Sequence, residues 1–145
     1  HFNKKPRIRV SLMPQTYSNV LEPKMQKISS RIQDINRLKQ LGWEVHINYS
    51  PVILYKGFIT EYDKLFKEVK DVAGENKCEV IFLTNHKFQM QKAPAEAQEM
   101  MAMSNQVKNT SGVMRYELGL KSKGISHFKE TYAKYFELDT IRYIF

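Results

Sequence analysis

Polar side chains that could contact a ligand lie together on one face of a predicted strand. Residues 44–50 alternate between apolar and polar types, as a half-buried strand does, and His46, Asn48 and Ser50 share the polar face. Pro51 is expected to end this strand, because proline has no N–H to donate to a sheet. In α/β folds, polar residues toward the C-terminal ends of strands build the site. These side chains are therefore candidate ligand contacts; the alternative is that they are satisfied inside the fold.

Two neighbouring predicted strands carry polar residues at the same end. Ser11 lies near the end of a strand predicted over 7–13, and Asn85 and His86 follow a strand predicted over 78–84. Because parallel strands end at the same edge of a sheet, three polar strand ends indicate a site there. The pattern identifies no particular reaction.

The sequence lacks the common catalytic motifs. It holds no glycine-rich phosphate loop, no Gly-x-Ser-x-Gly and no His-Glu-x-x-His, and its four histidines do not have metal-ligand spacing. Cys78 is its one cysteine, which excludes internal disulfides and any multi-cysteine metal site formed by this chain alone. We therefore predict no metal ligands in this chain and expect a reducing, cytoplasmic setting. No run of eighteen apolar residues occurs, so no membrane partner is expected.

The charge favours a polyanionic partner such as DNA. The sequence holds 23 Lys and Arg against 15 Asp and Glu, a formal net charge of +8, spread along the chain. The alternative is a surface that is merely well solvated. A hairpin predicted over 113–120 brings Arg115 and Tyr116 near Lys121 and Lys123. Such a hairpin could enter a nucleic-acid groove, with lysines on phosphates and the tyrosine stacking or wedging.

The elements that position these residues follow from periodicity. The first part of the chain is expected to contain a strand over 7–13, a loop over 14–23, a helix over 25–41 closed by Gly42, the strand 44–50, a helix from Thr60 to Gly74 and the strand 78–84. The later part is expected to contain a helix over 94–103, a turn over 109–112, the hairpin with Gly119 as its bulge or turn residue, a helix over 125–136 and a strand over 141–145. Three parallel strands with two helices form either half of a barrel or a small open sheet. We favour half of a barrel.

Several short segments of the sequence resemble the C-terminal half of the spore photoproduct lyase family of radical S-adenosylmethionine enzymes. The matching segments are residues 9–14, 41–43, 45–52, 62–66, 80–84, 115–116 and 140–145. The resemblance covers most of the chain and is weakest over 87–112. The sequence begins at His1 rather than methionine, which suggests a fragment or a processed product.

The resemblance implies a partial (β/α)6 barrel of TIM type. Residues 1–86 would be its later strand–helix units, and 87–145 a C-terminal extension with a DNA-facing hairpin and a final helix. In this family the N-terminal half carries a Cys-x-x-x-Cys-x-x-Cys motif for a 4Fe–4S cluster that cleaves S-adenosylmethionine, and the resulting radical acts on a thymine dimer in DNA. Such a cluster needs three thiolates, so the intact protein would need an N-terminal half as partner to this chain.

The resemblance also implies roles for single residues. Ser11 falls on the strand whose serine contacts the cofactor, and Ser50, Pro51 and Val52 fall on the turn along its adenosyl part. His46 and Asn48 would then point into the barrel beside them.

Arg115 and Tyr116 match the Arg-Tyr pair of the family's DNA-probing hairpin. Glu117 follows them where the family usually has lysine, and a carboxylate there would repel phosphate. Two other hypotheses are therefore kept: a basic α/β module that binds nucleic acid without catalysis, and a family member with a different substrate.

Overall fold

Four parallel strands form the main sheet. The computed structural model describes residues 6–86, 93–102, 106–108 and 113–145. The strand order is β1-β2-β3-β7, and every neighbouring pair is parallel. The strands are β1 (Arg7–Leu12), β2 (Glu44–Val52), β3 (Cys78–Phe82) and β7 (Ile141–Ile144). The predicted strand–helix alternation and the terminal strand are thus confirmed.

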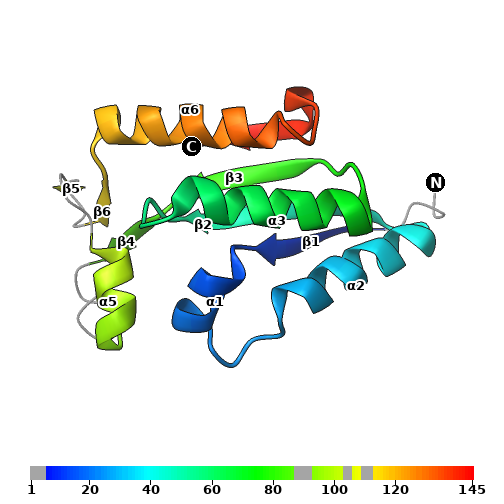
Figure 1. Ribbon diagram of the computed structural model, residues 1–145, viewed down its shortest axis with the longest axis horizontal. Helices are drawn as coiled ribbons and strands as arrows, with labels where there is room; N and C mark the ends of the chain where they lie inside the picture. The colour runs from blue at the N-terminus through cyan, green and yellow to red at the C-terminus, as the bar shows by residue number, and fades with distance from the viewer. Residues whose placement is uncertain (1–5, 87–92, 103–105, 109–112) are drawn as a thin grey trace.

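Three helices cover one face of this sheet (Figure 1). They are α2 (Ile28–Gln40), α3 (Phe58–Ala73) and α6 (Leu118–Tyr132). Helix α2 packs on β1, β2 and α3, and α3 packs on α6. In the part of the chain that the structure describes, no helix is long and apolar enough to cross a membrane.

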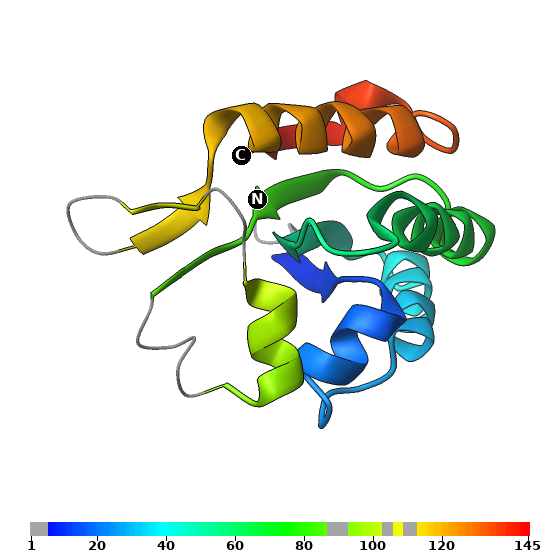
Figure 2. The same ribbon diagram turned by 60° about the vertical axis from the view of Figure 1, so that its left-hand side comes forward.

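A second, smaller sheet extends from the C-terminal ends of the main strands (Figure 2). Its antiparallel order is β4-β6-β5, formed by β4 (Thr84–His86), β6 (Val113–Tyr116) and β5 (Gln106–Lys108). Two short helices, α1 (Gln15–Leu21) and α5 (Ala95–Met101), lie at the same end of the main sheet and contact each other.

The prediction that Pro51 ends its strand is wrong. Strand β2 continues to Val52, and the Ser50–Pro51 peptide bond is cis. The register with β3 shifts between Tyr49 and Val52, so an extra residue of β2 faces β3 at this point. Proline is tolerated at such an irregularity, because no ladder hydrogen bond is required of it.

The loop predicted over 14–23 and the predicted start of the helix at Thr60 also need correction. Residues 14–23 are not all loop, because α1 forms after Pro14, whose carbonyl oxygen accepts the first-turn N–H groups of Tyr17 and Ser18. Helix α3 begins at Phe58 rather than Thr60. Gly57 precedes it with φ of +74°, a left-handed conformation that favours glycine.

The predicted hairpin over 113–120 is wrong. Strand β6 pairs with β4 and β5, whereas residues 118–120 form the first turn of α6. Gly119 is therefore a helical residue and not a bulge, and α6 begins well before the predicted position 125. The turn signal over 109–112 lies outside the described residues. The helix predicted over 94–103 is present but shorter, as α5 (Ala95–Met101), and position 103 lies outside the described residues.

An aromatic cluster holds the helices on the sheet. Phe66 of α3 is fully buried and contacts the rings of Tyr49, Phe128 and Tyr132 at centroid distances of 5.4, 5.2 and 5.3 Å. All three pairs are edge-to-face, a favourable geometry for aromatic rings. The cluster therefore joins β2, α3 and α6 in one core.

We expect Phe66→Ala to destabilise the fold by about 3–5 kcal/mol, since it removes a fully buried ring from this cluster. The matched control is Ile59→Ala on the same helix, where the side chain is 47% exposed and the cost should stay within about 0.5 kcal/mol. Urea unfolding followed by circular dichroism measures both. Similar losses in the two variants would show that the cluster does not hold the helices in place.

Candidate cofactor and nucleic-acid site

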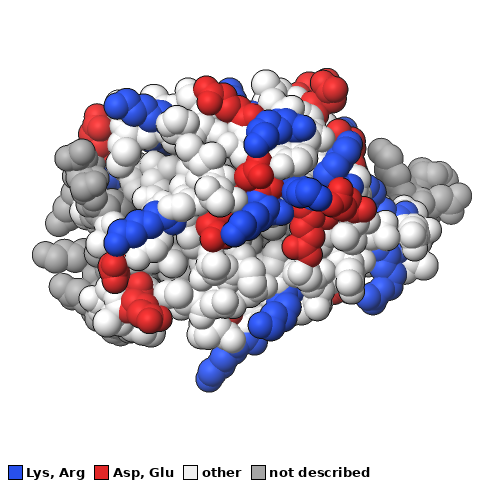
Figure 3. Space-filling view, viewed as in Figure 1, with Lys and Arg blue, Asp and Glu red and all other residues white. Residues whose placement is uncertain are grey.

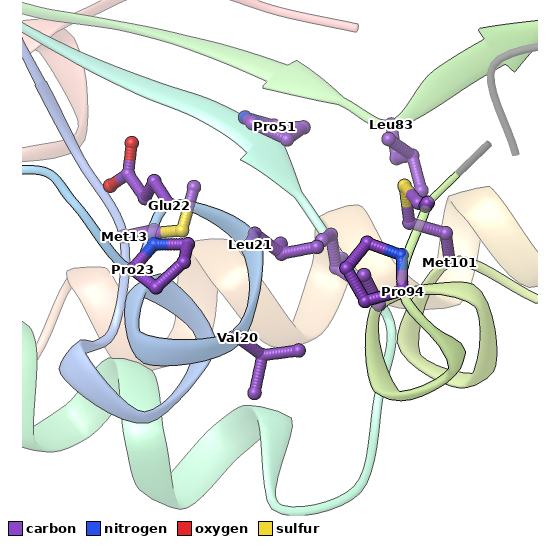
Figure 4. Close-up of a pocket in the computed structure, with 12 residues that line it drawn as sticks. Met13, Val20, Leu21, Glu22, Pro23, Pro51, Leu83, Pro94 and Met101 are labelled. Atoms are coloured by element: carbon purple, nitrogen blue, oxygen red, sulfur yellow. The ribbon is translucent and has the colours of Figure 1, made fainter.

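A cavity of about 340 Å³ lies at the C-terminal ends of the main strands (Figure 4). Met13 follows β1, Pro51 belongs to β2, and Leu83 follows β3, so three neighbouring strand ends form one wall. Helices α1 and α5 form the opposite wall, with Leu21 and Met101 among the lining side chains. This volume lies within the range of small-molecule sites, and an apolar lining of this kind suits an apolar ligand group.

Glu22 is the one charged side chain among the cavity's lining residues, and it is already engaged. Its Oε1 atom accepts a hydrogen bond from Ser18 Oγ at 3.0 Å and forms an ion pair with Arg31 Nη2 at 2.8 Å. The guanidinium group compensates its charge, so the cavity does not repel an anionic or neutral ligand.

Ser11 and Asn48 are brought together as the sequence predicts. They are register partners on β1 and β2, and partners across a parallel pair point to the same side of the sheet. The buried Oδ1 atom of Asn48 has no hydrogen-bond partner in the described part of the chain. A buried amide oxygen without a partner is costly, so this atom is available to accept a hydrogen bond from a ligand.

Ser50 and Pro51 lie at the end of the same strand, and only Pro51 lines the cavity. Val52 is fully buried in the hydrophobic core. A cofactor contact from Val52 would therefore have to come from its backbone, whereas Pro51 presents its ring to the cavity.

His46 occupies a different environment from Asn48. It is 1% exposed, and its Nδ1 atom lies 3.0 Å from the Glu79 carboxylate. Arg9 Nε donates to the same carboxylate at 3.1 Å, and Arg142 Nη1 lies 3.9 Å from it. This charge cluster lies toward the N-terminal ends of the strands, the end associated with stability in barrels. The fold therefore satisfies one ring nitrogen of His46, whereas its buried Nε2 atom has no hydrogen-bond partner among the described residues and lies 3.6 Å from the Glu44 carboxylate.

The charge cluster depends on Glu79, which sequence reasoning missed. Glu79 is buried within the short strand β3. The apolar residues of β3 are enough to predict the strand, so the prediction assigns no role to Glu79. An acidic residue inside an apolar strand is itself a signal, because a buried carboxylate is almost always paired with a cation.

The predicted DNA-binding residues are dispersed over two elements. Arg115 is exposed on β6, but Lys121 and Lys123 lie on α6 rather than on a hairpin. Tyr116 is only 3% exposed, and its Oη atom accepts the backbone N–H of Leu54 at 2.8 Å. Burial raises the pKa of Tyr116 to about 12. In this position Tyr116 fixes the segment after β2 to the second sheet, and its ring is not at the surface.

Glu117 caps the N-terminus of α6. Its carboxylate oxygens accept the N–H groups of Gly119 at 2.9 Å and Leu120 at 3.1 Å. These two hydrogen bonds hold the pKa of Glu117 below its ordinary value. The negative charge is partly compensated by the positive end of the helix dipole, which weakens the expected repulsion of phosphate.

The thiol of Cys78 is a core group. It is fully buried, and its Sγ atom donates to Tyr132 Oη at 3.5 Å. Burial raises the pKa of the thiol to about 12. Among the described residues, no group of three or more His, Cys, Asp and Glu side chains could hold a metal ion. These residues do not fit an iron–sulfur cluster, which needs several thiolates.

The fold is shared with solved structures of spore photoproduct lyase. The chain matches solved structures of spore photoproduct lyase with a TM-score of 0.76, over 98% of its own length and 44% of theirs. These include a mutant with bound AdoMet and dinucleoside spore photoproduct and a complex with dinucleoside spore photoproduct, each 14% identical in sequence, and another mutant, 15% identical. No family model matches the sequence, and neither does any curated protein. The match confirms the predicted half barrel.

We expect Glu117→Ala to lower the thermal midpoint at neutral pH, because two N–H groups of α6 lose their acceptor. The folded pKa of Glu117 is lowered, so its ionised form stabilises the protein above the unfolded pKa, and this contribution is lost as the pH falls through the folded pKa. The difference between wild type and variant should therefore shrink at acidic pH. Calorimetry across pH measures it, with the exposed Glu130→Ala on the same helix as control. A difference that is independent of pH would contradict the charged cap.

Proposed function

We propose that this chain is the later part of a radical S-adenosylmethionine enzyme that repairs a thymine photolesion in DNA. The observation that carries the proposal is the match over 98% of the chain to spore photoproduct lyase structures, some of which hold AdoMet or the dinucleoside lesion. The chain spans 44% of the length of those proteins, so the proposed activity belongs to the intact protein.

The residues of the main sheet would divide the contacts to S-adenosylmethionine between them. The apolar cavity beside Pro51 and Leu83 would take the adenine ring. Ser11 and Asn48 do not line this cavity and lie earlier along β1 and β2, so they would serve polar groups of the cofactor that extend along the sheet. The cofactor supplies radical chemistry when bound. This chain's own part is to bind and orient it and to exclude water with the apolar side chains of the cavity.

An N-terminal half of the barrel is the proposed partner of β1. Strand β1 stands at the end of the strand order, so within the described residues only one of its edges is paired. An open strand edge favours pairing with a further strand. The iron–sulfur cluster would be held by that N-terminal half, because Cys78 is buried in the core of this chain. A cytoplasmic setting, in which thiolate ligands stay reduced, belongs to the same proposal.

DNA is the proposed macromolecular partner. The formal net charge of +8 favours a polyanion, and Arg115 is exposed on the second sheet. The helix-covered face of the main sheet carries basic and acidic residues side by side (Figure 3). Such a mixed surface attracts DNA weakly, so the contacts are expected at the second sheet and the opposite face of the main sheet.

The decisive experiment is turnover by the intact protein with its cluster reconstituted. Supplied with S-adenosylmethionine, a one-electron reductant for the cluster and a dinucleoside spore photoproduct, it should release thymine-containing monomers, detected by chromatography. DNA binding without turnover would instead support a non-catalytic nucleic-acid module, and cofactor cleavage without lesion turnover would support a different substrate.

We expect Leu21→Trp to weaken S-adenosylmethionine binding about tenfold, because an indole at this position fills part of the cavity. Leu21 is partly exposed at the cavity wall, so the fold should tolerate the larger ring. Isothermal titration calorimetry on the intact protein measures the affinity. Leu138→Trp is the control, since Leu138 is exposed and does not line the cavity. Unchanged affinity in Leu21→Trp would place the cofactor elsewhere.

A further inference from the structure

Two aromatic rings lie exposed at the end of β7. Tyr143 is 40% and Phe145 is 56% exposed. Their ring centroids are 5.3 Å apart and their planes meet at 25°, so the rings are stacked. The other aromatic rings that contact one another around Phe66 are buried. A stacked pair exposed to water forms an apolar patch that the fold itself does not use.

The pair lies on the face of the main sheet that the helices leave bare. Tyr143 is the register partner of Glu79, so both side chains point to the same side. Ile141 and Ile144 pack against the core on the helix side. The register between β3 and β7 shifts between Ile141 and Tyr143. Because of this irregularity, the side chain of Tyr143 lies on the same face of the sheet as that of Glu79.

The exposed charge beside the pair is positive. Glu79 is buried, whereas the side chains of its partners Arg9 and Arg142 are 53% and 38% exposed. Solvent therefore meets two guanidinium groups and not the carboxylate between them. Aromatic rings and cations together on an open sheet face are the combination by which several folds bind unpaired nucleotides. The rings stack on bases, and the cations attract phosphates.

We propose that Tyr143 and Phe145 form a platform on which an unpaired nucleobase stacks, with Arg9 and Arg142 attracting the neighbouring phosphates. The inference rests on the proposed function in taking DNA as the partner. It assigns the base contact to β7, whereas the sequence places DNA contacts only in residues 115–123. A base extruded from a duplex exposes both of its faces, and a flat aromatic pair offers a matching surface.

The test measures binding of the intact protein to fluorescent single-stranded oligothymidine and to an abasic oligonucleotide of equal length. Fluorescence anisotropy should show Tyr143→Ala combined with Phe145→Ala binding oligothymidine about tenfold more weakly, with little change for the abasic strand. Tyr143→Phe combined with Phe145→Tyr should bind as the wild type does, because the rings are kept. Ile59→Ala combined with Leu138→Ala is the matched control, since both side chains are exposed and apolar.

Three results for the alanine pair would overturn the platform: unchanged binding of oligothymidine, equal weakening of both oligonucleotides, or a lower thermal midpoint of the intact protein. The last result would mean that another segment of the protein covers the rings. Lesion turnover and cofactor binding are measured in parallel on the same variants. If the wild type turns over the lesion and the alanine pair binds bases as the wild type does, the platform alone is contradicted. If the wild type neither turns over the lesion nor binds DNA, the proposed function is contradicted.

Discussion

The structure depends on the aromatic contacts that hold α3 and α6 against one face of the sheet. Tyr49 points from β2 to the helix side and meets both Phe66 and Phe128. Because the rings contact edge-to-face within a closed core, neither helix can shift without losing several contacts at once. The apolar side chains of β2 on the side of Tyr49 therefore pack against the helices. Because side chains alternate along a strand, the residues between them, Asn48 among them, point to the opposite face of the sheet.

The bare face then needs its own means of holding buried charge. Glu79 lies on β3 between β2 and β7, and it contacts side chains from β1, β2 and β7. One carboxylate thus links all four strands of the main sheet. A buried ion pair gains little net stability, but a carboxylate left without its cations would be strongly unfavourable. The cluster therefore acts chiefly against a slip of one strand along another, since a slip of one residue would turn Glu79 into the helix core.

The sequence predicts what is local and misses what depends on distant partners. Alternation and helical periodicity locate the main elements, and Gly74 ends α3 as expected. Strand β6 is predicted with the wrong partner. Its partner β4 lies far from it along the chain, and its other partner β5, although only residues 109–112 separate the two, is three residues long and too short for alternation to predict it. Pro51 has the local signal of a strand end, whereas its fit to β2 depends on the register with β3. Of the predicted site, alternation alone puts Ser11 and Asn48 on the same face of the sheet, where they are register partners. It does not place Tyr116, since the burial of that ring is decided by a contact with Leu54.

The cavity and the second sheet share parts of the same backbone. Leu83 alone separates β3 from β4, and its side chain lines the cavity while its N–H donates to Val52 at 2.9 Å. Tyr116 ties β6 to Leu54, just beyond the end of β2. The second sheet is therefore held at two points to the strand ends that form the cavity wall. A ligand that displaced this sheet would strain those hydrogen bonds, and so would change the wall against which the cofactor is proposed to bind.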